Sequence, residues 1–279
     1  MSNTHISSVL LITKGESGEA PRLGKEIGEW FESKGIGYKL FSNSHLPDLE
    51  ELDLFPNLIL VLGGDGTLLF VIRKYFGYNI PFLGINFGRV GFLTDIEPEQ
   101  WRKCLAEVLE GNASVCERLL LEYSVKRGGK KIRGGCAVND LVVSRSHLAR
   151  LITLCVEIGG EGHSCLRADG IIVSTPNGST GYCTAAGGAT VFPSLDVIEL
   201  CPVSPFMSRT VPLILPSDIL IRIWVEEPSG EAWFTIDGQE GFPLSIGDVV
   251  EINRSPNPLR FFIPPGSSYI KKLKLKGYI

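Results

Sequence analysis

Apolar and polar positions along the first third of the chain predict strands that alternate with helices. The run 58–62 is apolar throughout, as expected for a strand that is buried on both faces. Strands are predicted at 9–12, 38–41, 58–62 and 80–85. Helices are predicted at 19–34, 67–76 and 98–109. This alternation favours a parallel sheet covered by helices, with ligands bound beyond the carboxyl ends of the strands.

After Gly111 the pattern changes to alternating and β-branched stretches that are separated by turns rich in Gly, Pro and Asn. Such stretches occur at 119–125, 137–144, 151–158, 171–175, 219–225 and 249–252. They predict an all-β domain, best described as a sandwich. We therefore expect an α/β N-terminal domain with a Rossmann-like parallel sheet at 1–112 and an all-β C-terminal sandwich domain at 113–262. A lysine-containing tail at 263–279 is expected to dock back on the N-terminal domain.

The predicted strand 58–62 runs directly into the sequence Gly63-Gly64-Asp65-Gly66-Thr67. The three glycines have no Cβ, so the backbone can come close to a ligand. The helix that follows would turn its N-terminal N–H groups toward an anion such as phosphate. A carboxylate beside phosphates can act as a base, or it can hold Mg²⁺ that in turn binds phosphate. The alternative interpretation is an ordinary turn between a strand and a helix.

A second candidate segment, 174–188, consists mainly of glycine and small hydroxyl residues and contains one aromatic residue, Tyr182. Small side chains leave room for a flat ligand, and hydroxyl and backbone N–H groups can bind ribose, amide or phosphate. The Tyr182 ring offers a face for stacking a base or a nicotinamide. The alternative is a structural turn that leads into a helix of small residues, with Tyr182 in the core.

Asn139 and Asp140 stand immediately before the apolar strand 141–143. An amide and a carboxylate side by side can bind the two hydroxyl groups of a ribose. The same pair is also common as a turn or a cap next to a strand, and residue type alone does not separate these interpretations.

Composition narrows the class of protein. The net charge of −4 and the pI near 5.7 argue against a nucleic-acid-binding protein, which would show a basic face. Seven cysteines occur singly, without a Cys-x-x-Cys pair, and this predicts reduced thiols rather than a disulfide framework or a zinc site. No apolar run approaches the roughly 18 residues that span a bilayer. We expect a soluble, cytoplasmic protein that binds neither nucleic acid nor membrane.

Together these segments resemble the NAD kinase family, in the same order along nearly the whole chain. The Gly63–Thr67 loop is similar to the family's Gly-Gly-Asp-Gly signature, and 84–95 is similar to the segment that follows it. Asn139-Asp140 resembles the family's Asn-Glu/Asp motif. The stretch 168–188 resembles its glycine- and serine/threonine-rich NAD loop, and 237–239 (Asp-Gly-Gln) resembles a late motif.

The resemblance implies transfer of the γ-phosphoryl group of ATP to the 2′-hydroxyl group of the adenosine ribose of NAD. It implies Mg²⁺ or another divalent metal as the cofactor that accompanies ATP. It also implies an α/β domain followed by a β-sandwich, and a homodimer or homotetramer. Arg167 favours ATP over polyphosphate as the donor, because family members restricted to ATP tend to carry Arg at that position.

The resemblance also implies roles for individual residues. Asp65 would be the catalytic proton acceptor for the 2′-hydroxyl, with Gly66 beside it, and the phosphate-donor loop would be Gly63, Gly64, Gly66 and Thr67. Asn139 and Asp140 would bind ribose, and Asp169 would contact the nicotinamide end, often from a neighbouring subunit. The adenine and ribose pocket would be lined by Thr180, Gly181, Tyr182, Cys183, Thr184 and Ala185. Further NAD contacts would come from Arg150, Arg167 and Gln239.

Two other functions remain open at this point. A diacylglycerol-kinase-like lipid kinase can share the Gly-Gly-Asp-Gly-Thr loop, although this chain shows no amphipathic or basic membrane-binding segment. A non-catalytic sensor could bind NAD and regulate a partner. Incubation with ATP, Mg²⁺ and NAD separates these possibilities, because only an NAD kinase forms NADP.

Overall fold

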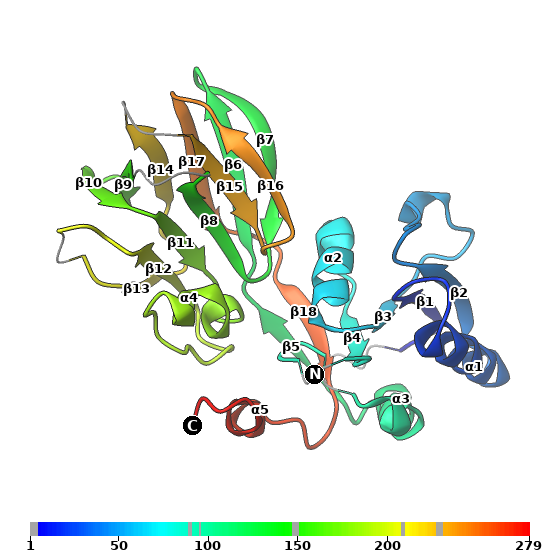
Figure 1. Cartoon of the computed structure of the whole chain (residues 1–279). Helices are drawn as coiled ribbons and strands as arrows, with labels where there is room; N and C mark the ends of the chain where they lie inside the picture. Colours follow the sequence, from blue (N-terminus) through cyan, green and yellow to red (C-terminus); the bar gives the residue numbers. More distant parts are fainter. Residues whose placement is uncertain (1–4, 89–90, 95, 147–150, 208–209, 227–230) are drawn as a thin grey trace. The chain divides into compact units, whose positions relative to one another are not determined.

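A computed structural model of the protein describes residues 5–88, 91–94, 96–146, 151–207, 210–226 and 231–279 (Figure 1). The contacts divide the chain into two units. The first unit comprises Met1–Glu117 and Leu259–Ile279, and the second comprises Arg118–Pro258. The chain therefore leaves the first unit and returns to it with its last strand and helix.

The first unit contains a six-stranded sheet whose order is β2-β1-β3-β4-β18-β5. The strands are β1 (Ser8–Thr13), β2 (Gly37–Ser42), β3 (Leu58–Leu62), β4 (Phe82–Ile85), β5 (Ser114–Arg118) and β18 (Leu259–Ile263). β1 pairs in parallel with β2 and β3, β3 pairs in parallel with β4, and β18 pairs in parallel with β4. Every residue of β1 and β3 is buried, as the apolar run 58–62 predicted for β3. The predicted parallel α/β sheet is confirmed.

Three helices of the first unit fall in the predicted helical segments, and a fourth, α5, lies in the tail. They are α1 (Glu19–Ser33), α2 (Asp65–Tyr75), α3 (Trp101–Leu109) and α5 (Tyr269–Leu275). Short 3₁₀ turns occupy Leu49–Glu51, Phe76–Tyr78 and Pro98–Gln100. α2 begins two residues earlier than predicted, because the carbonyl of Gly64 already accepts hydrogen bonds from Thr67 N–H and Leu68 N–H. In the described part of the chain, no helix is both long and apolar enough to cross a membrane.

The second unit contains two six-stranded antiparallel sheets, in the orders β10-β9-β14-β17-β6-β7 and β13-β12-β11-β8-β15-β16. The strands of the first of these sheets are β6 (Leu121–Arg127), β7 (Lys130–Ala137), β9 (Ile152–Ile158), β10 (His163–Ala168), β14 (Ile221–Glu226) and β17 (Asp248–Arg254). Those of the second are β8 (Asp140–Arg145), β11 (Gly170–Ser174), β12 (Val197–Val203), β13 (Leu213–Pro216), β15 (Ala232–Ile236) and β16 (Glu240–Leu244). One apolar core draws on both sheets, for example Val125 and Ile223 from one and Val143 and Phe234 from the other. The predicted all-β domain is confirmed.

The stretch 137–144, predicted from its alternation, is interrupted in the structure. β7 ends at Ala137 and β8 begins at Asp140. A tertiary contact explains the interruption. The carboxylate of Asp237, which is distant in the sequence, accepts hydrogen bonds from the N–H groups of Val138, Asn139 and Asp140.

The expectation that all cysteines are reduced is wrong in one place. Cys155 of β9 and Cys165 of β10 form a disulfide across the two strands. They lie directly opposite each other in the antiparallel register, and their Cα atoms are 4.0 Å apart. The sequence spacing of 10 residues matches no familiar motif, because the pairing depends on the register of a hairpin rather than on a fixed short spacing. Cys104, Cys116, Cys136, Cys183 and Cys201 are thiols that form no disulfide.

Candidate active site

Asp65 stands at the junction of β3 and α2, at the carboxyl end of a buried parallel strand. A carboxylate in the first turn of a helix is stabilised by the positive end of the helix dipole. The preceding turn needs glycine for a steric reason: a Cβ at Gly63 would lie 2.7 Å from the hydroxyl oxygen of Thr67. The backbone of this turn therefore packs directly against Thr67, the third residue of α2.

A loop from the same unit holds the Asp65 carboxylate in one orientation. Its Oδ2 atom accepts a hydrogen bond of 2.6 Å from Phe92 N–H. Its Oδ1 atom accepts three: from Leu93 N–H at 3.2 Å, from Thr94 N–H at 2.9 Å and from the Thr94 hydroxyl at 2.9 Å. A Cβ at Gly91 would lie 2.0 Å from Oδ1, so this loop approaches so closely only because residue 91 is glycine. Of the two oxygens, Oδ2 keeps more capacity to accept a further hydrogen bond.

The C-terminal helix α5 holds the same loop from its other side. The ammonium group of Lys272 donates a hydrogen bond of 2.7 Å to the carbonyl oxygen of Phe92. The Phe92 ring contacts the rings of Tyr269 and Tyr278, each at a centroid distance of 5.8 Å, and Lys276 Nζ lies 4.8 Å from its centroid. Phe92 thus connects Lys272 to Asp65. Its carbonyl oxygen accepts a hydrogen bond from Lys272, and its N–H donates one to Asp65.

Burial lowers the pKa of Lys272 to about 8, and the nearby Asp65 carboxylate partly opposes this shift. The sequence contained no signal for this lysine, because it is one of several in the tail and it reaches the loop only through the fold. Lys272 and Phe92 are therefore residues of the candidate site that sequence reasoning missed.

In the second unit, three distant segments meet around Asp237. Asp237 has a left-handed backbone (φ 50°), and its carboxylate accepts hydrogen bonds from Asn139 N–H at 2.7 Å and from Asp140 N–H and Val138 N–H at 3.2 Å each. Thr175 donates its hydroxyl to the Val138 carbonyl at 2.6 Å and its N–H to the Asn139 carbonyl at 2.8 Å. Sequence reasoning named Gln239 from the late motif, but the residue that organises the Asn139-Asp140 turn is Asp237.

The glycines of the 174–188 segment lie directly against this turn. A Cβ at Gly178 would lie 2.2 Å from the Asn139 carbonyl oxygen, so only glycine fits there. A Cβ at Gly181 would lie 3.9 Å from Oδ2 of Asp140. The structure therefore brings Asn139, Asp140, Gly178 and Gly181 together.

Asp140 is buried, and burial disfavours the ionised form of its carboxyl group. Desolvation raises its pKa to about 7, and the negative charge of Asp237 adds to the shift. A buried acid with a strongly raised pKa is typical of a functional site.

We expect Asp140→Asn to stabilise the protein at high pH. Because the folded-state pKa is raised, the carboxyl group costs nothing below about pH 4; the cost grows between about pH 4 and pH 7 and is constant above that. The gain should be about 1–4 kcal/mol at pH 8 and close to zero at pH 4. Urea unfolding at both pH values measures it, with the exposed Asp218→Asn as the control. A loss of stability that is equal at both pH values would contradict this account.

The short helices of the 174–188 segment separate exposed from buried side chains. A 3₁₀ turn covers Gly178–Thr180, and α4 covers Tyr182–Ala185. Tyr182 is 46% exposed, so its ring is available to a ligand. Cys183 is fully buried against Val142, Ile172 and Cys201, and burial raises the pKa of its thiol. Thr184 donates its hydroxyl to the Ser179 carbonyl. A ligand here could reach Tyr182 through its side chain but Cys183 only through its backbone.

The structure describes three further predicted contact residues, Asp169, Arg167 and Gln239. Asp169 forms an ion pair of 2.6 Å with Arg145. The Arg167 guanidinium lies 5.6 Å from the centroid of the Phe206 ring. Gln239 is exposed in the turn between β15 and β16. Arg150 lies outside the described residues.

Comparisons with known proteins agree with these motifs. Residues 18–113 match the model of the ATP-NAD kinase N-terminal domain, and residues 138–263 match that of the ATP-NAD kinase C-terminal domain. An NAD kinase from Nitratidesulfovibrio vulgaris (strain Miyazaki F) is 40% identical over 278 residues, which cover 99% of this chain and 98% of the relative.

Two solved structures are also similar. An NAD kinase from Archaeoglobus fulgidus in complex with ATP has a TM-score of 0.76 and 27% identity, covering 96% of this chain and 98% of that one. A yeast NADH kinase in complex with NADH has a TM-score of 0.86 and 22% identity, covering 98% of this chain and 88% of that one. The second similarity concerns the fold alone.

Proposed function

The chain belongs to the NAD kinase family, and we propose that it transfers the γ-phosphoryl group of ATP to the 2′-hydroxyl of the adenosine ribose of NAD, giving NADP and ADP. In this reaction the bond between the γ-phosphorus and the β,γ-bridging oxygen breaks. A bond forms between the same phosphorus and the ribose oxygen, whose proton must be removed. The observation that carries the proposal is the carboxylate of Asp65, held in a fixed orientation at the Gly-Gly-Asp-Gly-Thr turn.

Asp65 is proposed as the proton acceptor. A ribose hydroxyl is a weak nucleophile at neutral pH, so a carboxylate that takes its proton as charge develops assists the transfer. The four hydrogen bonds from residues 92–94 would orient the carboxylate, and Oδ2 would accept the hydroxyl proton. Gly63, Gly64, Gly66 and Thr67 would form the phosphate-donor loop at the N-terminus of α2, where backbone N–H groups and the helix dipole favour an anion.

NAD would be bound by residues of the second unit. We assign ribose binding to Asn139 and Asp140, and base contacts to Thr180, Gly181, Tyr182, Thr184 and Ala185, with Cys183 acting through its backbone. Asp169 would contact the nicotinamide end, and Arg150, Arg167 and Gln239 would make further contacts. Support comes from the packing of Gly178 and Gly181 against the Asn139-Asp140 turn.

A divalent cation such as Mg²⁺ accompanies ATP in phosphoryl transfer, where it neutralises charge on the phosphate oxygens. Asp65 offers the carboxylate oxygen that such an ion prefers. Among the described residues, no three His, Cys, Asp or Glu side chains around Asp65 lie close enough to form a complete protein cage. Such an ion would therefore be held mainly by phosphate oxygens and water, which leaves Asp65 available as the proton acceptor.

Lys272 is proposed as a positioning residue. Its ammonium group holds the Phe92 carbonyl, and the N–H of Phe92 holds Asp65 Oδ2. It would therefore act on the base through the loop.

Incubation of the full chain with ATP, Mg²⁺ and NAD tests the proposal through the formation of NADP. A panel of donors (ATP and polyphosphate) and acceptors (NAD, NADH and diacylglycerol) defines the specificity. NAD binding without formation of NADP would overturn the proposal in favour of a sensor. Phosphorylation of the lipid alone would overturn it in favour of a lipid kinase.

We expect Tyr182→Ala to raise the KM for NAD about fivefold to tenfold with little change in kcat. An aromatic contact of this kind is worth about 1 kcal/mol, and the exposed ring of Tyr182 can stack on the dinucleotide. Steady-state kinetics at varied NAD concentration measure the effect. Tyr182→Phe keeps the ring and should retain the KM. An unaltered KM in the alanine variant would assign Tyr182 a purely structural role.

From the family we also propose a cytoplasmic location and assembly into a homodimer or homotetramer. Light scattering coupled to size-exclusion chromatography of the full chain distinguishes the two assemblies. A monomer that retains full activity would contradict the proposed assembly.

A further inference from the structure

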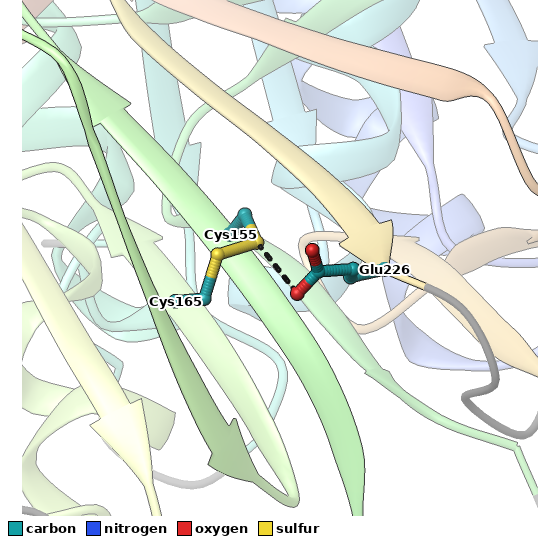
Figure 2. Close-up of side chains that lie close together, drawn as sticks. All are labelled: Cys155, Cys165 and Glu226. Atoms are coloured by element: carbon teal, nitrogen blue, oxygen red, sulfur yellow. Dashed lines mark hydrogen bonds between the residues drawn. A yellow bond between two sulfur atoms is a disulfide. The ribbon is translucent and has the colours of Figure 1, made fainter.

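Three potential metal ligands from three neighbouring strands meet on one face of the sheet that contains β10, β9 and β14. Figure 2 shows Cys155, Cys165 and Glu226, with the disulfide in yellow and a dashed line from Cys155 to the carboxylate. Cys155 pairs with Cys165 on one side and with Trp224 on the other, and Glu226 follows Trp224 by two residues on the same face. The candidate ligand atoms all lie within 4.8 Å of one another.

Solvent can reach this group from one side only. Cys155 is 1% exposed, whereas Cys165 and Glu226 are exposed. The Glu226 carboxylate lies 3.6 Å from the sulfur of Cys155. A small ion or a thiol reductant therefore has access to Cys165 and Glu226, whereas Cys155 is buried.

The three side chains all carry negative charge when they are ionised. Reduction of the disulfide would leave two thiols beside a carboxylate, and a nearby carboxylate disfavours thiolate formation. A divalent cation would remove this repulsion, because it binds both thiolates and the carboxylate at once.

We propose that reduction of the Cys155–Cys165 disulfide creates a site for one thiophilic divalent cation such as Zn²⁺, bound by the two sulfurs and the Glu226 carboxylate. Two thiolates and a carboxylate are ligands that zinc takes in proteins, and a water molecule completes the tetrahedron. The site exists only in the reduced chain, because a disulfide sulfur has no negative charge to share with a metal.

The chemistry balances with a dithiol as the reductant. The dithiol supplies two electrons and two protons, the S–S bond breaks, and the reductant becomes a cyclic disulfide. The two cysteine thiols then release their protons to solvent as the two sulfur–metal bonds form. A disulfide oxidant would take two electrons from the two thiolates and two protons from solvent, becoming a dithiol while the Cys155–Cys165 S–S bond re-forms and the ion is released. Metal binding and the disulfide therefore exclude each other.

The test uses Co²⁺, which reports tetrahedral thiolate ligation by its colour. Full-length protein is reduced with a dithiol, freed of reductant without air, and titrated with Co²⁺ and then Zn²⁺. We expect one Co²⁺ per chain, a sulfur-to-cobalt charge-transfer band, and loss of the band as Zn²⁺ displaces Co²⁺. The oxidised protein should give no band. None of these readouts depends on kinase activity.

Three variants locate the site. Cys155→Ser/Cys165→Ser should abolish the band, and the surface variant Glu226→Gln should weaken binding by at least about tenfold while leaving the fold intact. The matched control Cys104→Ser/Cys116→Ser removes two free thiols from the other unit and should leave the titration unchanged. Absence of the band in the reduced wild-type chain would overturn the proposal. Its survival in Cys155→Ser/Cys165→Ser would do the same.

Discussion

Asp65→Asn is expected to lower kcat by about 10²–10⁴-fold and to leave the affinity for NAD nearly unchanged. The amide keeps the size of the side chain but cannot take the ribose proton. Its oxygen can still accept hydrogen bonds from Leu93 and Thr94, whereas its NH₂ group would replace the oxygen that accepts the bond from Phe92 N–H. The loss should therefore appear in the chemical step, with some loosening of the loop.

Steady-state kinetics and calorimetric titration with NAD separate these two effects. Asp65→Ala is the second variant. It removes the carboxylate without placing an amide NH₂ group against Phe92 N–H, and its kcat should fall to a similar degree. The control is Asp53→Asn, which removes an exposed carboxylate of the same unit that pairs with Lys39. Unchanged turnover at saturating ATP and NAD would exclude Asp65 as the base.

Lys272→Met is expected to lower kcat by about tenfold to a hundredfold with a smaller effect on the KM for NAD. The estimate corresponds to the loss of one hydrogen bond from a charged donor, about 1.5–3 kcal/mol. Methionine keeps the length of the side chain but cannot hold the Phe92 carbonyl, so the loop that orients Asp65 would be less well fixed. Lys272→Arg should restore much of the activity, because a guanidinium can donate to the same carbonyl.

The pH profile gives a readout that a merely structural lysine would not change. The pKa of Lys272 is lowered to about 8, so its positive charge is present below that pH and is lost above it. The described charged groups that act on it are Asp65, which favours the protonated form, and Lys276, which opposes it. Wild-type kcat should therefore decline above pH 8, although the neutral amine still donates a weaker hydrogen bond. The decline should be absent in Lys272→Arg, since arginine stays charged.

Lys274→Met is the matched control, because Lys274 is exposed on the same helix. Its kcat and pH profile should equal those of the wild type. If Lys272→Met and Lys274→Met behave alike, or if the alkaline decline persists in Lys272→Arg, then Lys272 has no part in positioning Asp65.

Local patterns were sufficient for most of the elements. The strand 58–62 and the helix 19–34 were predicted to within one residue of β3 and α1, because the period of apolar residues reports which faces are buried. The predicted ends of strands were less accurate where a side chain from a distant part of the chain bonds to the backbone. The break before β8 depends on Asp237, which lies 97 residues beyond Asp140 and has no local mark of its partner.

The candidate site divides in a similar way. Asp65, Asn139 and Asp140 could be named from residue types and motif order alone. Phe92 and Asp237 lie in segments matched to family motifs, but only the structure shows what they contact: Phe92 N–H bonds Asp65, and Asp237 bonds the backbone of 138–140. Lys272 lies in no matched motif, and it reaches the Phe92 carbonyl only through the fold. The disulfide of Cys155 and Cys165 could not be predicted for another reason. It depends on the register of the hairpin, and a shift of one residue would place the two sulfurs on opposite faces of the sheet.

The sequence by itself determined the two kinds of architecture, the glycine turn with its carboxylate, and the family to which the chain belongs. These features depend on short stretches of sequence. Burial on one or both faces of an element sets the spacing of its apolar residues, and a tight turn requires glycine. Only the tertiary structure decided which groups hold Asp65, which carboxylate is forced toward its neutral form, and which cysteines meet. Those outcomes depend on contacts across long separations, such as the 180 residues between Lys272 and Phe92, and on burial that no local pattern reports.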